Sequence, residues 1–207
     1  MEMNARQQFD EQGTLMFEEA ELPLSSEEWQ QIESLLNEVE YEHIVGGDAG
    51  EGHSVWVCRF YNDVDKPTAL HDHSEEIANI IMSPKMKAFY KQIMGTDELC
   101  MRRCQGNLLH KDDYIGVHVD QDSNPDYFAT VVLHLDSVYQ GGEFITRDQQ
   151  RGDHSYKPEK RSILVNDCSI PHEVSSIESG ERKTLACFMS KSFAESCHHR
   201  KKFRVVK

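Results

Sequence analysis

The sequence predicts an α+β protein in which helices come first and a mainly β core follows. Residues 25–95 carry apolar side chains at helical spacing, bounded by residues that cap helices. From about residue 99, short runs of β-branched and aromatic residues alternate with Asp, Asn, Gly and Pro. Strands of this length and spacing are typical of an antiparallel sandwich or barrel.

The length of 207 residues predicts a single domain, residues 1–207, large enough to bury a core. Within it we expect a helical and mixed supporting region over residues 1–98, a β core over residues 99–192 and a basic tail over residues 193–207. The formal charge of −14 argues against a nucleic-acid partner and against binding to an anionic membrane. No apolar run approaches the roughly 18–20 residues that cross a bilayer, and the first residues do not resemble a signal peptide, so we expect a cytoplasmic protein.

Three helices are predicted in the first half of the chain. The first begins at Ser25, which matches a capping box with Glu28, and its apolar residues recur at helical spacing to about residue 39. The second follows Ser74 as its cap. The third begins at Ser83–Pro84, with proline at the first helical position, and ends at Gly95.

The chain around these helices is less regular. Residues 1–20 predict a short edge strand or a loose arm, the glycine-rich residues 46–52 predict a loop, and residues 55–61 predict a strand. The stretch His71–His73 could supply metal ligands or form a polar turn before the next helix. Because no acidic or histidine partner lies nearby at a ligand spacing, we favour the turn.

The second half contains six runs with strand character. They are Tyr114–Val119, Tyr127–Leu135, Glu143–Thr146, Ser162–Val165, His172–Ile177 and Leu185–Met189. The six cysteines form no C-x-x-C pair, so we expect free, buried thiols rather than bridges or zinc ligands. These cysteines are Cys58, Cys100, Cys104, Cys168, Cys187 and Cys197.

His118 and Asp120 are the first candidates for metal ligands. Residues two apart in a strand point to the same face, so both side chains can aim at one point inside a barrel. His172, which follows Pro171 and opens another strand-like run, is the natural third ligand. Two histidines and one carboxylate on one face leave the opposite positions open, as in the facial triad of non-haem Fe(II) oxygenases.

The same H-x-D pattern occurs again at His134 and Asp136. His134 lies in the most apolar run of the chain, residues 129–135, where a structural histidine is the better interpretation. His118 instead precedes a polar loop, which suits a site at the mouth of a barrel. We therefore predict that the first pattern binds the metal and the second does not.

Arg182 and Thr184 follow the third ligand and suggest a dicarboxylate. An arginine binds a carboxylate in a bidentate way, and a hydroxyl two residues further on the same strand face can donate to it as well. An arginine between Glu181 and Lys183 could also belong to a solvated salt bridge. The position after His172, with Thr184 beside it, favours the binding role.

The ordered set His118-x-Asp120, Gly141-Gly142-Glu143, His172 and Arg182 with Thr184 resembles the Fe(II)/2-oxoglutarate-dependent dioxygenases, most closely the prolyl-4-hydroxylase-like branch. The resemblance covers about residues 100–190. It implies a double-stranded β-helix, or jelly roll, supported by the N-terminal helices. It also implies that the triad binds Fe(II), that Arg182 binds the distal carboxylate of 2-oxoglutarate, and that O2 is consumed. The Gly-Gly-Glu turn is structural in this resemblance.

One position departs from the pattern of that branch. Its members often carry a tyrosine about nine residues before the first ligand, in contact with the cosubstrate, and this chain has Leu109 there. Tyr114 or Asn107 are the candidates to replace it.

The resemblance implies hydroxylation of an unactivated C–H bond. A peptidyl residue such as proline is the first candidate substrate, and a free amino acid or small metabolite is the second. Candidate contacts are the His71–His73 turn, residues 147–154, and four individual side chains: Arg103, Gln121, Asp122 and Arg147.

Two other classes of protein remain as alternatives. A non-catalytic, cupin-like metal-binding module would not need the dicarboxylate pair Arg182 and Thr184. A zinc hydrolase would need a general base near the open metal positions, and Glu173 is the obvious candidate. As the strand neighbour of His172, Glu173 should face away from the metal.

Overall fold

The computed structural model describes residues 3–47, 50–63, 68–136 and 138–191. Its helices are α1 (Ala5–Gln12), the 3-10 turn η1 (Glu19–Glu21), α2 (Ser26–Glu38), α3 (Ser74–Ile81), α4 (Pro84–Met94) and the short α5 (Asp120–Ser123). Its strands are β1 (Thr14–Phe17), β2 (Glu42–Val45), β3 (His53–Asn62), β4 (Thr68–Ala69), β5 (Cys100–Leu109), β6 (Tyr114–His118), β7 (Ala129–His134), β8 (Tyr139–Gly141), β9 (Phe144–Asp148), β10 (Gly152–Tyr156), β11 (Ile163–Asp167), β12 (His172–Val174), β13 (Ile177–Gly180) and β14 (Arg182–Ser190).

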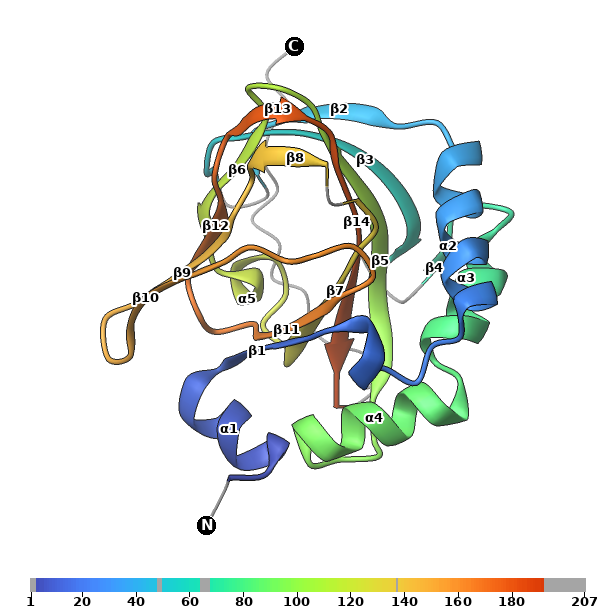
Figure 1. Cartoon of the computed structure of the whole chain (residues 1–207), viewed down its shortest axis with the longest axis vertical. Coiled ribbons are helices and arrows are strands. Elements are labelled where there is room, and N and C mark those ends of the chain that lie inside the picture. The colour runs from blue at the N-terminus through green and yellow to red at the C-terminus, as the bar shows by residue number, and fades with distance from the viewer. Residues whose placement is uncertain (1–2, 48–49, 64–67, 137, 192–207) are drawn as a thin grey trace.

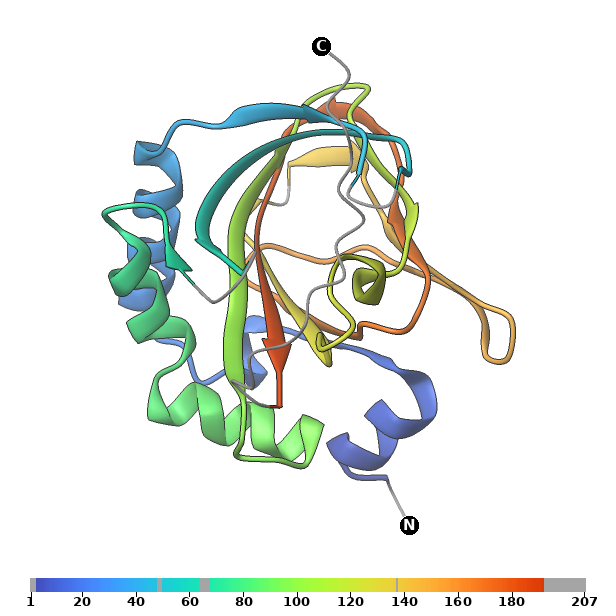
Figure 2. The same ribbon diagram turned by 180° about the vertical axis from the view of Figure 1, so that it is seen from behind.

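One strongly curved antiparallel sheet forms the body of the protein. Its strand order is β1-β11-β7-β14-β5-β3-β6-β12-β9-β10, with β2 and β4 also paired to β3, and β8 pairs separately with β13. The first six strands make one wall and the last four fold over to face it, which gives a nearly closed barrel (Figures 1 and 2). This confirms the predicted mainly β jelly roll with helices supplied by the N-terminal half.

The helices α2, α3 and α4 lie against the outside of the first wall (Figure 1). Apolar residues at helical spacing along these three helices are fully buried, among them Trp29, Ile32, Ile81 and Tyr90. They pack in one cluster with the outward-facing residues of the wall, such as Leu133. Fully burying one large apolar side chain contributes roughly 1.5–3 kcal/mol, so this layer stabilises the wall behind the barrel interior.

Most predicted elements are confirmed, with boundaries shifted by a few residues. The capping box at Ser25 and Glu28 is present, and the helix after Ser83 ends at Gly95 in the left-handed conformation. Ser74 is the first residue of α3 rather than its cap, because its hydroxyl donates to the carbonyl of Phe60. The run His172–Ile177 is divided between β12 and β13.

Eight elements were not predicted: α1, η1, β2, β4, β5, α5, β8 and β10. Two of them, α1 and β5, matter most to the architecture. Helix α1 begins with a capping box between Asn4 and Gln7 within the predicted arm, and β1 follows as the expected edge strand. Strand β5 lies between β14 and β3 in the first wall. Its sequence lacked a strand pattern because its inward-facing residues are polar, as described below.

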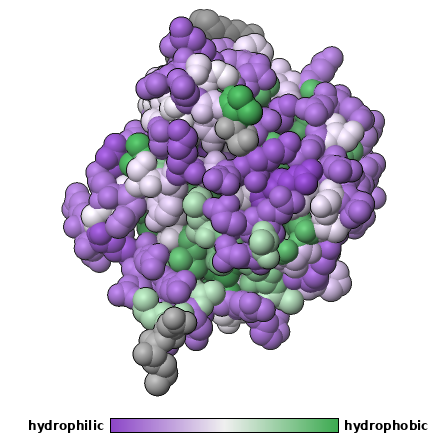
Figure 3. Space-filling model, in the orientation of Figure 1, coloured by the Kyte–Doolittle hydropathy of each residue, from purple (hydrophilic) through white to green (hydrophobic). Residues whose placement is uncertain are grey.

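The predicted basic tail, residues 193–207, lies outside the described residues, as does Cys197. The other five cysteines are free and buried, as expected. On the face seen in Figure 3, hydrophilic residues cover most of the surface, and hydrophobic ones gather in its lower middle. No helix within the described residues is long and apolar enough to cross a membrane.

Candidate active site

The three predicted ligands meet at one point. His118 ends β6 and His172 begins β12, and the two residues are direct partners on these antiparallel strands. Asp120 starts α5, but the intervening Val119 is still extended, so the alternation of strand faces continues and brings the carboxylate to the same side. One ligand atom from each residue lies within 4.8 Å of the others, and within the described ranges no other group of this kind is found.

Backbone carbonyls orient both imidazoles. His118 Nδ1 donates to the carbonyl oxygen of Gly116 at 2.9 Å, and His172 Nδ1 donates to that of Ile170 at 2.9 Å. Each histidine thus carries its proton on Nδ1, which donates to the carbonyl two residues earlier. The other ring nitrogen, Nε2, then has a free lone pair that can bind a metal. The two Nε2 atoms lie 3.4 and 3.8 Å from the same oxygen, Oδ1 of Asp120. The two Nε2 atoms and Oδ1 of Asp120 therefore point to one place, where together they could bind a metal ion.

Asp120 is held as a buried carboxylate. Its second oxygen, Oδ2, accepts a short hydrogen bond from the hydroxyl of Thr130 on β7, so Oδ1 faces the histidines. Burial alone would raise the pKa of Asp120, but attraction to His172 when that ring is protonated in acid, and the hydrogen bond with His118, bring it below its usual range. Burial lowers the pKa of His172 to about 4, so this ring is neutral near pH 7.

Arg182 lies at the start of β14 and is only 2% exposed. Its Nη2 donates to Nε2 of His134 at 3.1 Å. Four polar atoms in this region are buried without a hydrogen-bond partner: Arg182 Nε, Thr184 Oγ1, Tyr139 Oη and His134 Nδ1. Burying such groups unpaired costs free energy, so their clustering indicates a site for a polar ligand.

His134 is therefore more than a core residue. It is buried and lies outside the metal cluster, as predicted, but it also holds the guanidinium of Arg182. Because arginine can only donate, Nε2 of His134 must be the acceptor and the ring must be neutral. Burial, and then the charge of Arg182, keep the pKa of His134 well below its usual range.

This depressed pKa predicts a loss of stability in acid. Below about pH 6.5, His134 is protonated in the unfolded chain but stays neutral in the folded protein. This difference lowers the free energy of unfolding by up to about 1.4 kcal/mol per pH unit. We expect the stability difference between wild type and His134→Gln, measured by urea unfolding without metal from pH 7.5 to 5.5, to shift toward the variant as the pH falls. Histidines common to both proteins cancel in this difference. Parallel pH profiles would contradict the assignment.

The position of the missing tyrosine lies inside the barrel. Leu109 is fully buried and is the direct partner of Arg182 between β5 and β14. Of the two candidates to replace a tyrosine there, Asn107 lines the cavity opposite Thr184, while Tyr114 is 39% exposed and lies outside the cavity lining. Tyr139, which sequence reasoning missed, places its buried hydroxyl near Arg182 from the separate strand β8.

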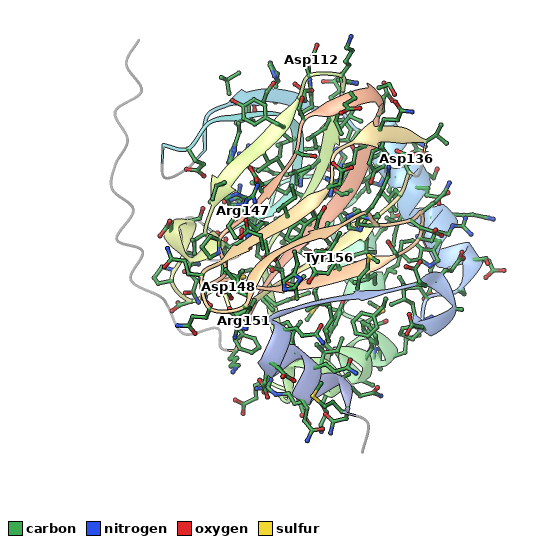
Figure 4. The ribbon with its side chains drawn as sticks, turned by 60° about the vertical axis from the view of Figure 1, so that its left-hand side comes forward. Asp112, Asp136, Arg147, Asp148, Arg151 and Tyr156 are labelled. Carbon is green, nitrogen blue, oxygen red and sulfur yellow. The ribbon has the colours of Figure 1, made fainter. Side chains whose placement is uncertain are left out.

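The predicted substrate contacts separate into two groups. Arg103 is buried in the cavity wall. Gln121, Asp122 and Arg147 lie outside the cavity lining: Gln121 donates to the carbonyl of Tyr127, and Asp122 is exposed. Arg147 lies on the β9–β10 hairpin (Figure 4), where its guanidinium bonds Asp153 and Glu173.

The remaining candidates also face away from the cavity. Glu173 is bonded to Arg147 on the outer side of β12, so it does not offer a general base to the open metal positions. His71 and His73 stack on each other, with ring centroids 5.2 Å apart, outside the metal cluster and the cavity lining. Sequence reasoning also missed three polar side chains of the cavity wall, which come from β3 and β5: His53, Arg59 and Gln105. They belong to no motif.

One cavity of about 120 Å³ connects the two ends of the site, because the triad, Arg182 and Thr184 all line it. Its donor set fits a divalent transition metal at one end, with two imidazoles and a carboxylate on one side. The unpaired donors at Arg182 and Thr184 fit an anion at the other end. The residues present therefore suit a metal ion together with a chelating acid that has a second, distal carboxylate.

Comparisons with known proteins agree with this geometry. Residues 104–190 match the model of the 2OG-Fe(II) oxygenase superfamily. No protein of curated function matches the chain. An oxidoreductase of the 2OG-Fe(II) oxygenase family from Burkholderia pseudomallei is 31% identical, with 93% of each chain covered and a TM-score of 0.83.

Two prolyl hydroxylases are similar in fold. One, a prolyl-4-hydroxylase from Pseudomonas putida, is 14% identical, with 89% of this chain and 95% of that chain covered and a TM-score of 0.61. The other comes from Trichoplax adhaerens and was solved with a peptide fragment of the hypoxia inducible factor oxygen degradation domain. It is 14% identical, with 89% of this chain and 86% of that chain covered and a TM-score of 0.64.

Proposed function

Because the chain belongs to the 2OG-Fe(II) oxygenase superfamily, with 31% identity to a member over 93% of its length, we propose that it hydroxylates an unactivated C–H bond. Enzymes of this family use Fe(II) and 2-oxoglutarate, which together with O2 supply the oxidising chemistry when bound. The observation that supports the proposal best is the single cavity that joins the triad to a buried arginine.

We assign the metal to His118, Asp120 and His172. The carbonyls of Gly116 and Ile170 fix both rings with Nε2 toward the metal, and Thr130 holds the carboxylate in place. These outer contacts would keep the three ligands preorganised on one side of a bound metal. Phe144 stacks on His172 with ring centroids 4.9 Å apart and shields that ligand from water.

We assign the distal carboxylate of 2-oxoglutarate to Arg182, Thr184 and Tyr139. Arg182 supplies the charge, and the hydroxyls of Thr184 and Tyr139 are buried beside it without other partners. His134 fixes the guanidinium by accepting from Nη2. In this assignment Tyr139, on a different strand, makes the contact with 2-oxoglutarate that a tyrosine at position 109 makes in the prolyl-4-hydroxylase-like branch.

Two kinds of substrate fit a hydroxylase of this fold. A peptidyl residue such as proline is one, and the resemblance to the prolyl-4-hydroxylase-like branch supports it, as do the two structural neighbours named prolyl hydroxylases. A free amino acid or other small metabolite is the other. Arg103 and Gln105, both buried in the cavity wall, favour this second candidate, because they suit a small polar molecule held inside the barrel.

The test of the proposed function needs no substrate. Fe(II) and then 2-oxoglutarate are added to the protein without oxygen while the visible spectrum is recorded. We expect a weak charge-transfer band that requires both additions and is absent in His172→Ala. Absence of the band in wild type, together with tight zinc binding, would favour a metal-binding module or a zinc hydrolase instead.

A further inference from the structure

The inner face of β5 carries a buried row of hydrogen-bonded side chains that the metal triad does not use. Nε of Arg103 donates to Oε1 of Gln105 at 2.9 Å, and Nε2 of Gln105 donates to Oδ1 of Asn107 at 2.8 Å. The three residues alternate along the strand, are buried and line the cavity. Buried polar groups are costly unless they are paired, so the bonds of such a row follow a fixed pattern.

Arg103 begins the row and is itself held by the protein. It is hydrogen-bonded to the hydroxyl of Tyr127, which donates in turn to Oδ1 of the buried Asp63 at 2.9 Å. Its guanidinium carbon also lies over the ring of Phe188, 5.3 Å from the ring centre. These contacts hold Arg103 in the cavity wall as a fixed donor to Gln105.

The chemistry of arginine gives the row a direction. A guanidinium can only donate, so Gln105 must turn its amide oxygen toward Arg103 and its nitrogen toward Asn107. Asn107 must then accept with its oxygen, and its nitrogen, which carries two N–H donors, is the group that remains for the cavity. Without Arg103, both amides would be free to turn over and present an oxygen there instead.

Asn107 lies at the end of the cavity that we assign to the distal carboxylate. It is the direct partner of Thr184 between β5 and β14, one inward-facing position from the pair Leu109 and Arg182. The hydroxyl of Thr184 and Nε of Arg182 are buried without hydrogen-bond partners. An anion bound to these two groups needs a neighbour that donates, and an amide oxygen in the same place would repel it.

We propose that Asn107 donates a side-chain N–H to the distal carboxylate of 2-oxoglutarate, and that Arg103 and Gln105 are positioning residues that direct this donor toward it. The inference rests on the proposed function and extends its cosubstrate site to strand β5. Arg103 then affects cosubstrate binding through two intervening side chains, without touching the cosubstrate.

The first measurement is the affinity for 2-oxoglutarate, from titration of the visible band in the anaerobic Fe(II) protein. We expect Asn107→Leu, which keeps a similar shape but has no donor, to weaken binding roughly 10-fold, because a hydrogen bond to a charged group is lost. Gln105→Met should weaken binding by a smaller factor, because the amide of Asn107 is then no longer held in one orientation. Asn37→Leu, at an exposed asparagine that accepts from Lys183, is the matched control and should bind as wild type does.

Double variants distinguish positioning from a general structural role. If Gln105 acts only through Asn107, adding Gln105→Met to Asn107→Leu should cause no further loss of affinity. Arg103→Met also removes a positive charge, so its effect on affinity should become smaller in the Asn107→Leu background without vanishing. Iron content and thermal melting of each variant check that the metal site and the fold are intact.

The second measurement observes the donor itself. NMR spectra of the 15N-labelled protein are recorded with Zn(II), which occupies the metal site without turnover. The side-chain amide signal of Asn107 is assigned by its absence from Asn107→Leu. We expect an amide proton of Asn107 to shift downfield when 2-oxoglutarate is added, and to shift less in Gln105→Met.

Three results would overturn the inference: wild-type affinity in Asn107→Leu, additive losses of affinity in the double variant of Asn107 and Gln105, or an amide signal that 2-oxoglutarate does not shift. If the visible band forms in wild type and any of these results is obtained, only this inference is wrong. If the band does not form in wild type, the proposed function itself fails.

Discussion

Replacing Asp120 with alanine is expected to abolish iron binding and turnover while the protein stays folded. The carboxylate supplies the one negative ligand, and its Oδ1 atom lies within 4 Å of both imidazoles. Loss of a contact behind a ligand costs roughly 10- to 100-fold in metal affinity, so loss of the ligand itself should cost more. Iron content after anaerobic loading and gel filtration measures the effect, and circular dichroism checks the fold.

The second H-x-D pattern supplies a matched control. Asp136 follows His134 at the same spacing, but it is only partly buried and lies outside the metal cluster (Figure 4). Asp136→Ala should therefore bind iron as wild type does. Loss of iron from Asp136→Ala, with retention in Asp120→Ala, would mean that the wrong pattern has been assigned to the metal.

Replacing Arg182 with methionine is expected to weaken 2-oxoglutarate binding by about 3 kcal/mol, or roughly 100-fold, with little change in iron affinity. The substitution keeps a long side chain but removes the charge that would bind the distal carboxylate. Titration of 2-oxoglutarate into the anaerobic Fe(II) protein, followed by its visible band, measures this affinity without turnover. The triad is unchanged in this variant, so iron content should be normal.

The same substitution should leave the protein without ligands at least as stable as wild type. Arg182 is buried with Nε unpaired, and burial lowers its pKa. Its buried charge therefore lowers the stability of the folded protein when no carboxylate is bound. Lys183→Met is the control, because Lys183 faces outward and bonds Asn37. Tyr139→Phe removes one hydroxyl and should cause a smaller loss of affinity than Arg182→Met. Unchanged 2-oxoglutarate affinity in Arg182→Met would reject the assignment.

The sequence correctly predicted that the three triad residues meet, because local geometry decides that outcome. The spacing of His118 and Asp120 brings two side chains to one face of an extended chain, whatever surrounds them. Pro171 opens the strand that begins with His172, and the structure pairs that residue with His118. The helix beginning after Ser25 is likewise marked by its own capping box.

Strand β5 shows where such reasoning fails. Its inward-facing row of Arg103, Gln105 and Asn107 is polar because it lines the cavity, and this hides the usual alternation of apolar and polar residues. Its outer face holds Gly106, where a Cβ atom would come within 3.1 Å of Tyr41 Oη and 3.3 Å of Leu36 Cδ2. A strand with polar residues on its inner face and a glycine packed closely against a helix on its outer face lacks the sequence pattern that predicts a strand.

The sequence by itself determined the helix caps, most of the strands, and the order of the three ligands and Arg182. These features depend on residues that are close along the chain, or on spacings that fix which face of a strand each side chain points to. Only the tertiary structure decided that His134 supports Arg182, that Tyr139 lies beside it, and that Arg103 shares the cavity with the triad. These contacts join strands that are distant in sequence, and their partners follow from the register of the folded sheet, which no local pattern encodes.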